Sequence, residues 1–396
     1  MKYIFLVPDG MADLPLTELD GQTPMQAART PNFDRLAETA VIGSVLTVPD
    51  GMYPGSDAAN MSLLGFDPRR YYTGRGPIEA AAIGVPMDVH DVAFRCSLVY
   101  SDGDRMLDYS SGHITTEEAA PLIELVSKKL GTRQNNFYPG VSYRHIMVRR
   151  NGSINLATTP PHDITGKELS DYWPQGDDDD LLQQMMYDSM ELLHNHPVNR
   201  KRVEEGKSPA NMIWLWGQGF APSLPSFFST FGLQGSVITA VDVVRGLARA
   251  TSMNVVEVPG ATGFIDTNYL GKGQYAVNSL QSNDFVFVHV ESPDESGHLG
   301  NIEYKIRSIE DIDQKVLGPI IESMAKIQDF RVLIAPDHKT PISLKSHESG
   351  PVPFLLYDST KPNRGRKIPF DERAITESSV HVEDGTRLIR MLLQQA

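Results

Sequence analysis

Short apolar runs that end in polar residues recur along this chain, and they predict strands with chemical groups at their ends. Residues 3–7, YIFLV, lead directly into a Pro-Asp-Gly turn, and residues 285–290, FVFVHV, lead into a segment rich in acidic and histidine residues. The run RVLI at 331–334 leads into a third segment of this kind. Strands of open α/β sheets deliver side chains to the loops at their carboxyl ends. The pattern therefore predicts a site along one edge of a sheet.

Runs with helical character separate many of these strands. Residues 33–40 (FDRLAETA) and 57–65 (DAANMSLLG) are of this type, and 241–251 (VDVVRGLARAT) adjoins the strand-like runs SVITAV and NVVEV. Alternation of strand and helix indicates a mostly parallel sheet flanked by helices. We assign the apolar run NMIWLW at 211–216 to the same sheet.

The pattern changes between about residue 88 and about residue 209. Alternating segments such as 94–103 (FRCSLVYSDG) and 143–157 (YRHIMVRRNGSINLA) are typical of half-exposed antiparallel strands. A long helix is predicted over 180–195. The chain is therefore predicted to be an α/β protein, with a discontinuous core formed by residues 1–86 and 211–396 and an inserted α+β domain formed by residues 88–209.

Composition and charge narrow the class of protein. The 396 residues are 40% hydrophobic, which supports sizeable cores, and the single cysteine, Cys96, excludes an intramolecular disulfide. The apolar start is interrupted at Pro8 and Asp9, too early for a secretory signal, and we find no transmembrane run. A cytoplasmic protein without a membrane partner is predicted. The net charge of −14 argues against nucleic acid as a partner, because phosphate-backbone binding needs a basic face.

Carboxylate and imidazole groups gather after the three strand ends. Asp294 and His298 are four residues apart, the spacing that brings two side chains together on one helical turn. Oxygen and nitrogen ligands without thiolate suit Mn, Zn, Mg or Co-like divalent ions, and the number of groups suits two ions. His289, which lies among apolar neighbours, is interpreted as a core or supporting histidine. The candidate ligands are Asp9, Asp294, His298, Asp337, His338 and His347.

Ser56 is the candidate nucleophile. It follows Gly55 in the loop 49–57 (PDGMYPGSD), whose two prolines and two glycines specify the backbone closely, and it begins a helical run. The hydroxyl could be an ordinary helix cap, but free N–H groups at a helix start also favour a phosphate. A serine needs a base or a metal to become nucleophilic. We therefore predict phosphoryl transfer through a phosphoserine, and no P-loop motif points to ATP.

Five motifs resemble the cofactor-independent phosphoglycerate mutases, specifically the archaeal-type branch, which belongs to the alkaline phosphatase superfamily. They are PDG at 8–10, PGSDAAN at 54–60, HVESPDESGH at 289–298, APDHKTP at 335–341 and SHESGPVPF at 346–354. The resemblance implies an alkaline-phosphatase-like core. It also implies that one ion is held by Asp294, His298 and His347, and the other by Asp9, Asp337, His338 and the hydroxyl of Ser56.

The same resemblance implies a reaction. Ser56 would accept the phosphoryl group of 3-phosphoglycerate and return it to the neighbouring oxygen, giving 2-phosphoglycerate without added bisphosphoglycerate. The inserted domain would close over this small anionic substrate and exclude water. Candidate substrate contacts, each with a plain structural alternative such as an exposed strand cation, are Arg144, His145, Asp163, Lys272 and Arg75.

Other functions fit the same core. A homoserine kinase-like phosphotransferase would use the same serine and metals with a phosphoryl donor, and phosphatase or phosphonate-related activity is a further alternative. A metal-stabilised binding protein is disfavoured, because it would give Ser56 no reason to lie in so constrained a loop. Fold analogy alone does not choose between mutase and kinase.

Overall fold

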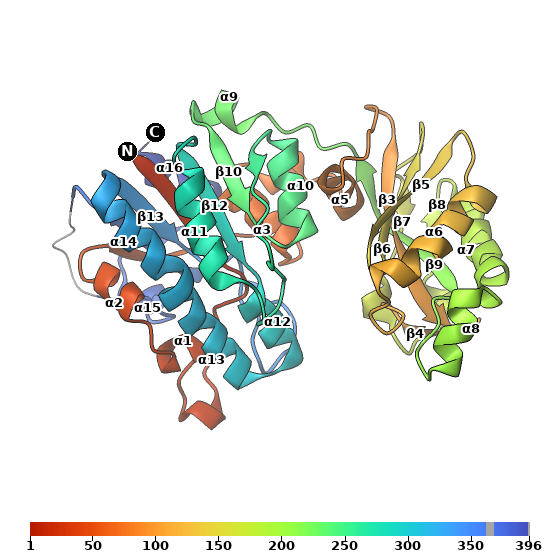
Figure 1. Cartoon of the computed structure of the whole chain (residues 1–396), viewed down its shortest axis with the longest axis horizontal. Helices are drawn as coiled ribbons and strands as arrows, with labels where there is room; N and C mark the ends of the chain where they lie inside the picture. The colour runs from red at the N-terminus through yellow and green to blue at the C-terminus, as the bar shows by residue number, and fades with distance from the viewer. Residues whose placement is uncertain (362–367, 395–396) are drawn as a thin grey trace. The chain divides into compact units, whose positions relative to one another are not determined.

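The computed structural model describes residues 1–361 and 368–394, which form two compact units (Figure 1). Unit 1 comprises residues 1–72 and the chain from Leu224 onwards, and unit 2 comprises residues 73–223.

Unit 1 is built on an eight-stranded sheet in the order β11-β10-β12-β1-β13-β14-β2-β15. All neighbouring pairs are parallel except those made by β14, which runs antiparallel to both β13 and β2. The strands in this order are Asn254–Val255, Gly235–Ile238, Phe285–Val290, Lys2–Pro8, Phe330–Ile334, Val352–Asp358, Val41–Val45 and His381–Val382.

Helices flank this sheet, which confirms the predicted fold class of an α/β core with a mostly parallel sheet. In Figure 1, α11 (Tyr269–Ser279), α13 (Ile302–Asp311) and α14 (Gly318–Ile327) lie over the sheet as one layer. A second packed group is formed by α3 (Ser56–Leu63), α10 (Asp242–Ala250) and α16 (Thr386–Leu393). Two layers of helices explain why the central strands are continuous apolar runs: parallel strands covered on both faces have no solvent side.

The register of the central strands positions the site. Pro8 on β1 pairs with Val290 on β12, and Leu6 on β1 pairs with Ile334 on β13. The three strands therefore end at the same edge of the sheet, and the segments that follow them begin side by side. This arrangement brings together the three polar segments that the sequence pattern singled out.

Unit 2 contains a five-stranded antiparallel sheet in which β3 pairs with β4, β6 and β9, and β6 pairs with β5. Alternate residues of β3 face opposite sides: Phe94 and Cys96 enter the main core, whereas Ala93 packs with Ala80 on the other face. The elements are α5 (Arg75–Ala82), β3 (Val92–Ser101), β4 (Met106–Asp108), α6 (Thr116–Leu130), β5 (Asn135–Val141), β6 (Arg144–Arg149), α7 (Asp179–His194) and β9 (Met212–Phe220).

The prediction that residues 211–216 join the parallel sheet is wrong. These residues belong to β9, which pairs antiparallel with β3 in unit 2 instead of joining the parallel sheet. Helix α5 also packs on β3 and β9, so the boundaries of the units lie at 73 and 223 instead of the expected 88 and 209. A buried apolar strand has the same pattern in a parallel and an antiparallel sheet, and its sequence does not reveal which sheet it joins.

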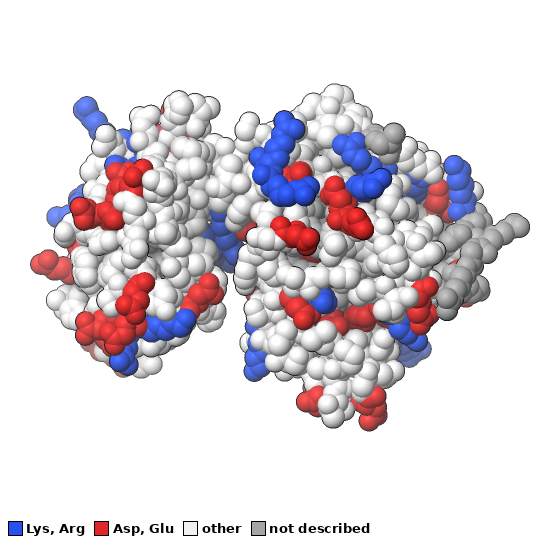
Figure 2. Space-filling model, turned by 180° about the vertical axis from the view of Figure 1, so that it is seen from behind, with Lys and Arg blue, Asp and Glu red and all other residues white. Residues whose placement is uncertain are grey.

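Charged side chains are distributed in small groups of mixed sign. On the face shown in Figure 2, Lys and Arg side chains of the described residues lie next to Asp and Glu side chains, without a continuous basic band. The exclusion of nucleic acid stays a prediction. Every helix in the described part of the chain is too short or too polar to traverse a bilayer.

Candidate metal centre

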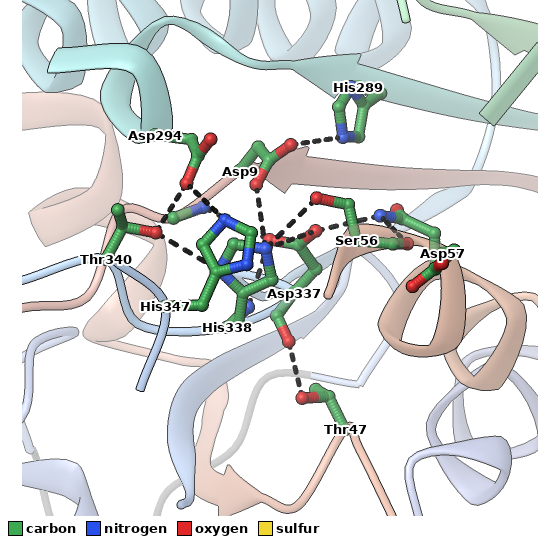
Figure 3. A network of polar contacts seen from close by, with 12 residues as sticks. Asp9, Thr47, Ser56, Asp57, His289, Asp294, Asp337, His338, Thr340 and His347 are labelled. Carbon is green, nitrogen blue, oxygen red and sulfur yellow. Dashed lines mark hydrogen bonds and ion pairs between the residues drawn. The ribbon is translucent and has the colours of Figure 1, made fainter. Parts of the chain in front are cut away.

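The predicted ligands come together at the shared edge of β1, β12 and β13 (Figure 3). Asp9 directly follows β1, and Asp337 and His338 follow β13. Asp294 and His298 lie on one turn of α12 (Ser292–Leu299), as their spacing predicted. The strand register thus explains why residues more than 300 positions apart in the chain, such as Asp9 and Asp337, become neighbours.

One candidate group contains Asp294, His298 and His347. The Nε2 atom of His298 lies 3.3 Å from Oδ2 of Asp294, and Nε2 of His347 lies 3.4 Å from Oδ1 of the same carboxylate. The two Nε2 atoms are 3.0 Å apart. Burial raises the pKa of Asp294, but hydrogen bonds from the two histidines hold it well below its usual range. Ligand atoms of the three residues all lie within 4.8 Å of one another, so this group could hold a cation.

A second group surrounds His338 and includes Ser56. Nε2 of His338 lies 3.4 Å from Oδ1 of Asp9, 3.5 Å from Oδ2 of Asp337 and 3.1 Å from Oγ of Ser56. Ser56 is the first residue of α3, and Gly55 occupies the cap position. The hydroxyl of Ser56 therefore faces the acidic and histidine cluster, which does not favour the interpretation of this residue as an ordinary helix cap.

Asp9 provides the test of whether these residues fit a cation. Its side chain is buried, and neither carboxylate oxygen makes a hydrogen bond among the described residues, although Nε2 atoms of His289 and His338 lie 3.1 and 3.4 Å away. Burial raises the pKa of Asp9 well above its usual value, and the nearby Asp337 and Asp294 raise it further. A buried carboxylate without a hydrogen bond is costly unless a cation compensates it. The residues therefore fit a divalent cation bound by oxygen and nitrogen ligands.

His289, which the sequence pattern assigned to a core or supporting role, lies in direct contact with the candidate ligands. It is fully buried near the end of β12, and its Nε2 atom lies 3.1 Å from Oδ2 of Asp9. With Asp9 and Asp337 it forms another set of potential ligands. Burial lowers the pKa of His289 to about 4, so the ring is neutral. Its apolar neighbours concealed this position, although its place one residue before the strand end was an available signal.

Asn60 supports the centre and was missed by the sequence analysis. Its Nδ2 atom donates to Oδ2 of Asp337 and to the backbone carbonyl of Ser56, both at 2.8 Å. The backbone N–H groups of Gly10 and His338 donate to the other oxygen of Asp337. Asn60 lies one helical turn after Ser56, and this i,i+4 spacing was the signal that could have found it.

Lys272 occupies a different environment from that expected of a phosphate contact. Its side chain is fully buried, and Nζ donates to the backbone carbonyl of His289 at 2.9 Å. Burial lowers the pKa of Lys272 to about 8, against the opposing effect of Glu291. The fully buried position of Lys272 does not itself show a route to substrate, so a contact between this lysine and substrate stays a prediction.

The other predicted substrate contacts lie in unit 2. Arg75 begins α5 and pairs with Glu79 at 2.9 Å, whereas the Arg144 guanidinium lies 5.8 Å from the ring centroid of Tyr143. His145 is buried on β6, where its Nδ1 atom accepts a hydrogen bond from Gly140, and Asp163 is exposed. Adjacent strand residues point to opposite faces, so Arg144 and His145 face different sides of the sheet. Their roles stay predictions.

Taken together, the fold and the cluster of ligands define an α/β protein with a mostly parallel sheet and a candidate metal centre. A family model described as "2,3-bisphosphoglycerate-independent phosphoglycerate mutase" matches residues 37–199. A Geobacter sulfurreducens protein named "Probable 2,3-bisphosphoglycerate-independent phosphoglycerate mutase" is 49% identical, and a Methanosarcina mazei protein named as a mutase of the same kind is 46% identical. Both alignments cover 100% of this chain and 100% of the relative.

A solved structure agrees with these relatives. The cofactor-independent phosphoglycerate mutase of Thermoplasma acidophilum is 27% identical, with a TM-score of 0.66, and the alignment covers 100% of this chain and 99% of that one. The chain belongs to the 2,3-bisphosphoglycerate-independent phosphoglycerate mutase family, which confirms the resemblance seen in its motifs.

Proposed function

We propose that this chain interconverts 3-phosphoglycerate and 2-phosphoglycerate through a phosphoserine formed on Ser56. The observation that carries the proposal is the position of Ser56: its Oγ atom lies 3.1 Å from Nε2 of His338, at the start of α3 and beside the candidate metal ligands. We infer the substrate from the names of the relatives that match the full chain, which describe them as phosphoglycerate mutases.

The proposal includes two divalent ions of the Mn, Mg, Zn or Co type. Bound ions would supply a positive field that favours the ionised serine hydroxyl and neutralises the charge of the phosphoryl group. The first ion would be held by Asp294, His298 and His347, and the second by Asp9, Asp337, His338 and the hydroxyl of Ser56.

The residues of the chain have distinct tasks in this reaction. Oγ of Ser56 forms a new P–O bond and releases its proton as the bond from phosphorus to the C3 oxygen breaks, and the C3 oxygen takes up one proton. The C2 hydroxyl of the same glycerate then attacks the phosphoserine and releases its proton, and Oγ of Ser56 leaves and takes up one proton. Asn60 fixes the Ser56 carbonyl relative to Asp337, and the positive N-terminal end of α3 favours the charge of the phosphoryl oxygens.

An assay on purified protein tests the proposal. Incubation with 3-phosphoglycerate and Mn²⁺, without bisphosphoglycerate, should yield 2-phosphoglycerate in a ³¹P NMR spectrum. Ser56→Ala should lower the rate by at least about 10³-fold, because no other residue then accepts the phosphoryl group. Ser62→Ala is the matched control: it removes a buried hydroxyl on the same helix and should leave the rate almost unchanged.

The same assay separates the alternatives. Retained turnover in Ser56→Ala would exclude the phosphoserine route. Phosphorylation of homoserine by ATP, with no conversion of 3-phosphoglycerate, would instead assign the kinase-like activity, and release of inorganic phosphate alone would assign a phosphatase.

A further inference from the structure

Thr340 lies between the two candidate ligand groups and contacts both of them (Figure 3). It is fully buried in the segment that follows β13. Its Oγ1 atom lies 2.5 Å from Oδ1 of Asp294 and 3.2 Å from Nδ1 of His338. Asp294 belongs to the first group and His338 to the second, so one hydroxyl links them.

The direction of the hydrogen bonds follows from the chemistry of the three groups. A hydroxyl carries one hydrogen and two lone pairs, whereas an ionised carboxylate only accepts. In the form that would hold a cation, Asp294 is an ionised carboxylate and His338 is a neutral ring. Thr340 therefore donates to Asp294 and presents a lone pair to Nδ1 of His338. The hydrogen of the neutral His338 ring must then be on Nδ1, which leaves the lone pair of Nε2 directed toward Ser56 and Asp9.

The surrounding chain holds Thr340 firmly. Nζ of Lys305 donates to the Thr340 carbonyl at 2.7 Å, and the same buried ammonium pairs with Asp13 at 2.6 Å. The backbone N–H of Thr340 donates to the carbonyl of Ala12 at 3.2 Å. These bonds tie Thr340 to the segment after β1 and to α13.

Two glycines allow this close packing. A Cβ atom on Gly10 would lie 2.5 Å from Oγ1 of Thr340, and a Cβ atom on Gly297 would lie 2.4 Å from its carbonyl oxygen. Any side chain at either position would displace Thr340. Gly10 follows the candidate ligand Asp9, and Gly297 precedes the candidate ligand His298. The two segments that carry these ligands can therefore pack directly against Thr340.

We infer that Thr340 is a positioning residue: its hydroxyl couples the two ligand groups and fixes His338 in the tautomer that offers Nε2 to a cation. Supporting residues that orient histidine ligands in this way commonly change metal affinity by 10- to 100-fold when they are removed. The inference rests on the proposed function only for the statement that a divalent ion binds here.

Calorimetric titration of metal-free protein with Mn²⁺ tests the coupling. Thr340→Val preserves the shape but removes the hydroxyl, and it should weaken Mn²⁺ binding by about 10- to 100-fold. Thr340→Ser retains the hydroxyl and should bind close to the wild-type affinity. Thr251→Val removes another fully buried hydroxyl, which bonds only to helix carbonyls, and should not affect binding. Equal affinity in Thr340→Val and the wild type would overturn the inference.

A second test is the tautomer of His338 in long-range ¹H–¹⁵N NMR spectra of the metal-free wild type. The His338→Gln variant serves only to assign the signals of this ring. The His338 ring should carry its hydrogen on Nδ1, and a ring with hydrogen on Nε2 would overturn the inference even if Thr340→Val failed to fold. Failure of the wild type to bind Mn²⁺ would instead overturn the proposed function, so the two failures are distinguishable.

Discussion

Asp9 and Asp294 are carboxylates of similar burial whose pKa values move in opposite directions. Asp294 accepts a hydrogen bond from Thr340, and two histidines stabilise its anion. Asp9 makes no hydrogen bond within the described residues, although two histidine Nε2 atoms lie 3.1 and 3.4 Å away, and it lies near other acids. Burial alone therefore does not decide the charge of a carboxylate; its donors do. A bound cation would favour the ionised form of Asp9 and lower its pKa. This would explain why a buried carboxylate without a hydrogen bond is tolerated at this position.

Glu372 leads to a prediction about pH. It accepts hydrogen bonds from Thr23 and from the backbone of Asp13, and burial raises its pKa to about 7. The folded state thus binds this proton more tightly than the unfolded state, whose pKa is near 4.5. Protonated Glu372 therefore contributes a few kcal/mol to the free energy of unfolding below about pH 4.5. This contribution is lost as the pH rises to about 7.

Glu372→Gln should remove this dependence, because the amide is neutral at every pH and can still accept from the backbone of Asp13. We expect the variant to be more stable than the wild type above about pH 7, by roughly 1–3 kcal/mol in urea unfolding, and similar near pH 4.5. A variant that is less stable than the wild type above pH 7 would contradict the raised pKa of Glu372.

At the scale of elements, α12 must approach the segment after β13 very closely. Alanine normally favours a helix over glycine by up to about 1 kcal/mol. At position 297, however, the added Cβ atom would meet the Thr340 carbonyl at 2.4 Å, and backbone cannot rotate away. We expect Gly297→Ala to lower the free energy of unfolding by about 1–3 kcal/mol and to weaken Mn²⁺ binding.

Gly318→Ala at the start of α14 is the control for this prediction, since its Cβ atom would meet nothing closer than 3.3 Å. Both variants would be compared by urea unfolding of metal-free protein. If Gly297→Ala were as stable as Gly318→Ala, the close packing of α12 on Thr340 would be incorrect.

Elements also show what the sequence could reveal. The strand ends predicted Asp9, Asp294 and Asp337 as neighbours, because parallel strands share an edge. The i,i+4 spacing places Asn60 beside Ser56, but neither its bond to Asp337 nor the bonds of Thr340 could be predicted, because these depend on distances across the fold. Spacing along the chain identifies which strand a residue follows, but it does not identify the atoms that a hydroxyl or an amide will meet.

At the scale of the whole molecule, unit 2 is one continuous segment with a core of its own. Its main hydrophobic cluster lies entirely within residues 92–216. We expect residues 73–223, produced alone, to unfold cooperatively in urea with a defined near-UV circular dichroism spectrum. The segment 88–209 lacks α5 and β9, which leaves β3 without one strand partner and uncovers Ala93, and it should not fold. Equal folding of both segments would contradict the revised boundaries.

The two ligand groups differ in their access to water. The His298 side chain is 36% exposed, whereas those of His338 and Asp337 are 2% and 0% exposed. A cation beside His298 can leave directly into solvent, but one beside Asp337 must wait for the surrounding chain to open. The residence times of the two proposed ions should therefore be unequal, and a brief wash with chelator would then produce a half-loaded protein.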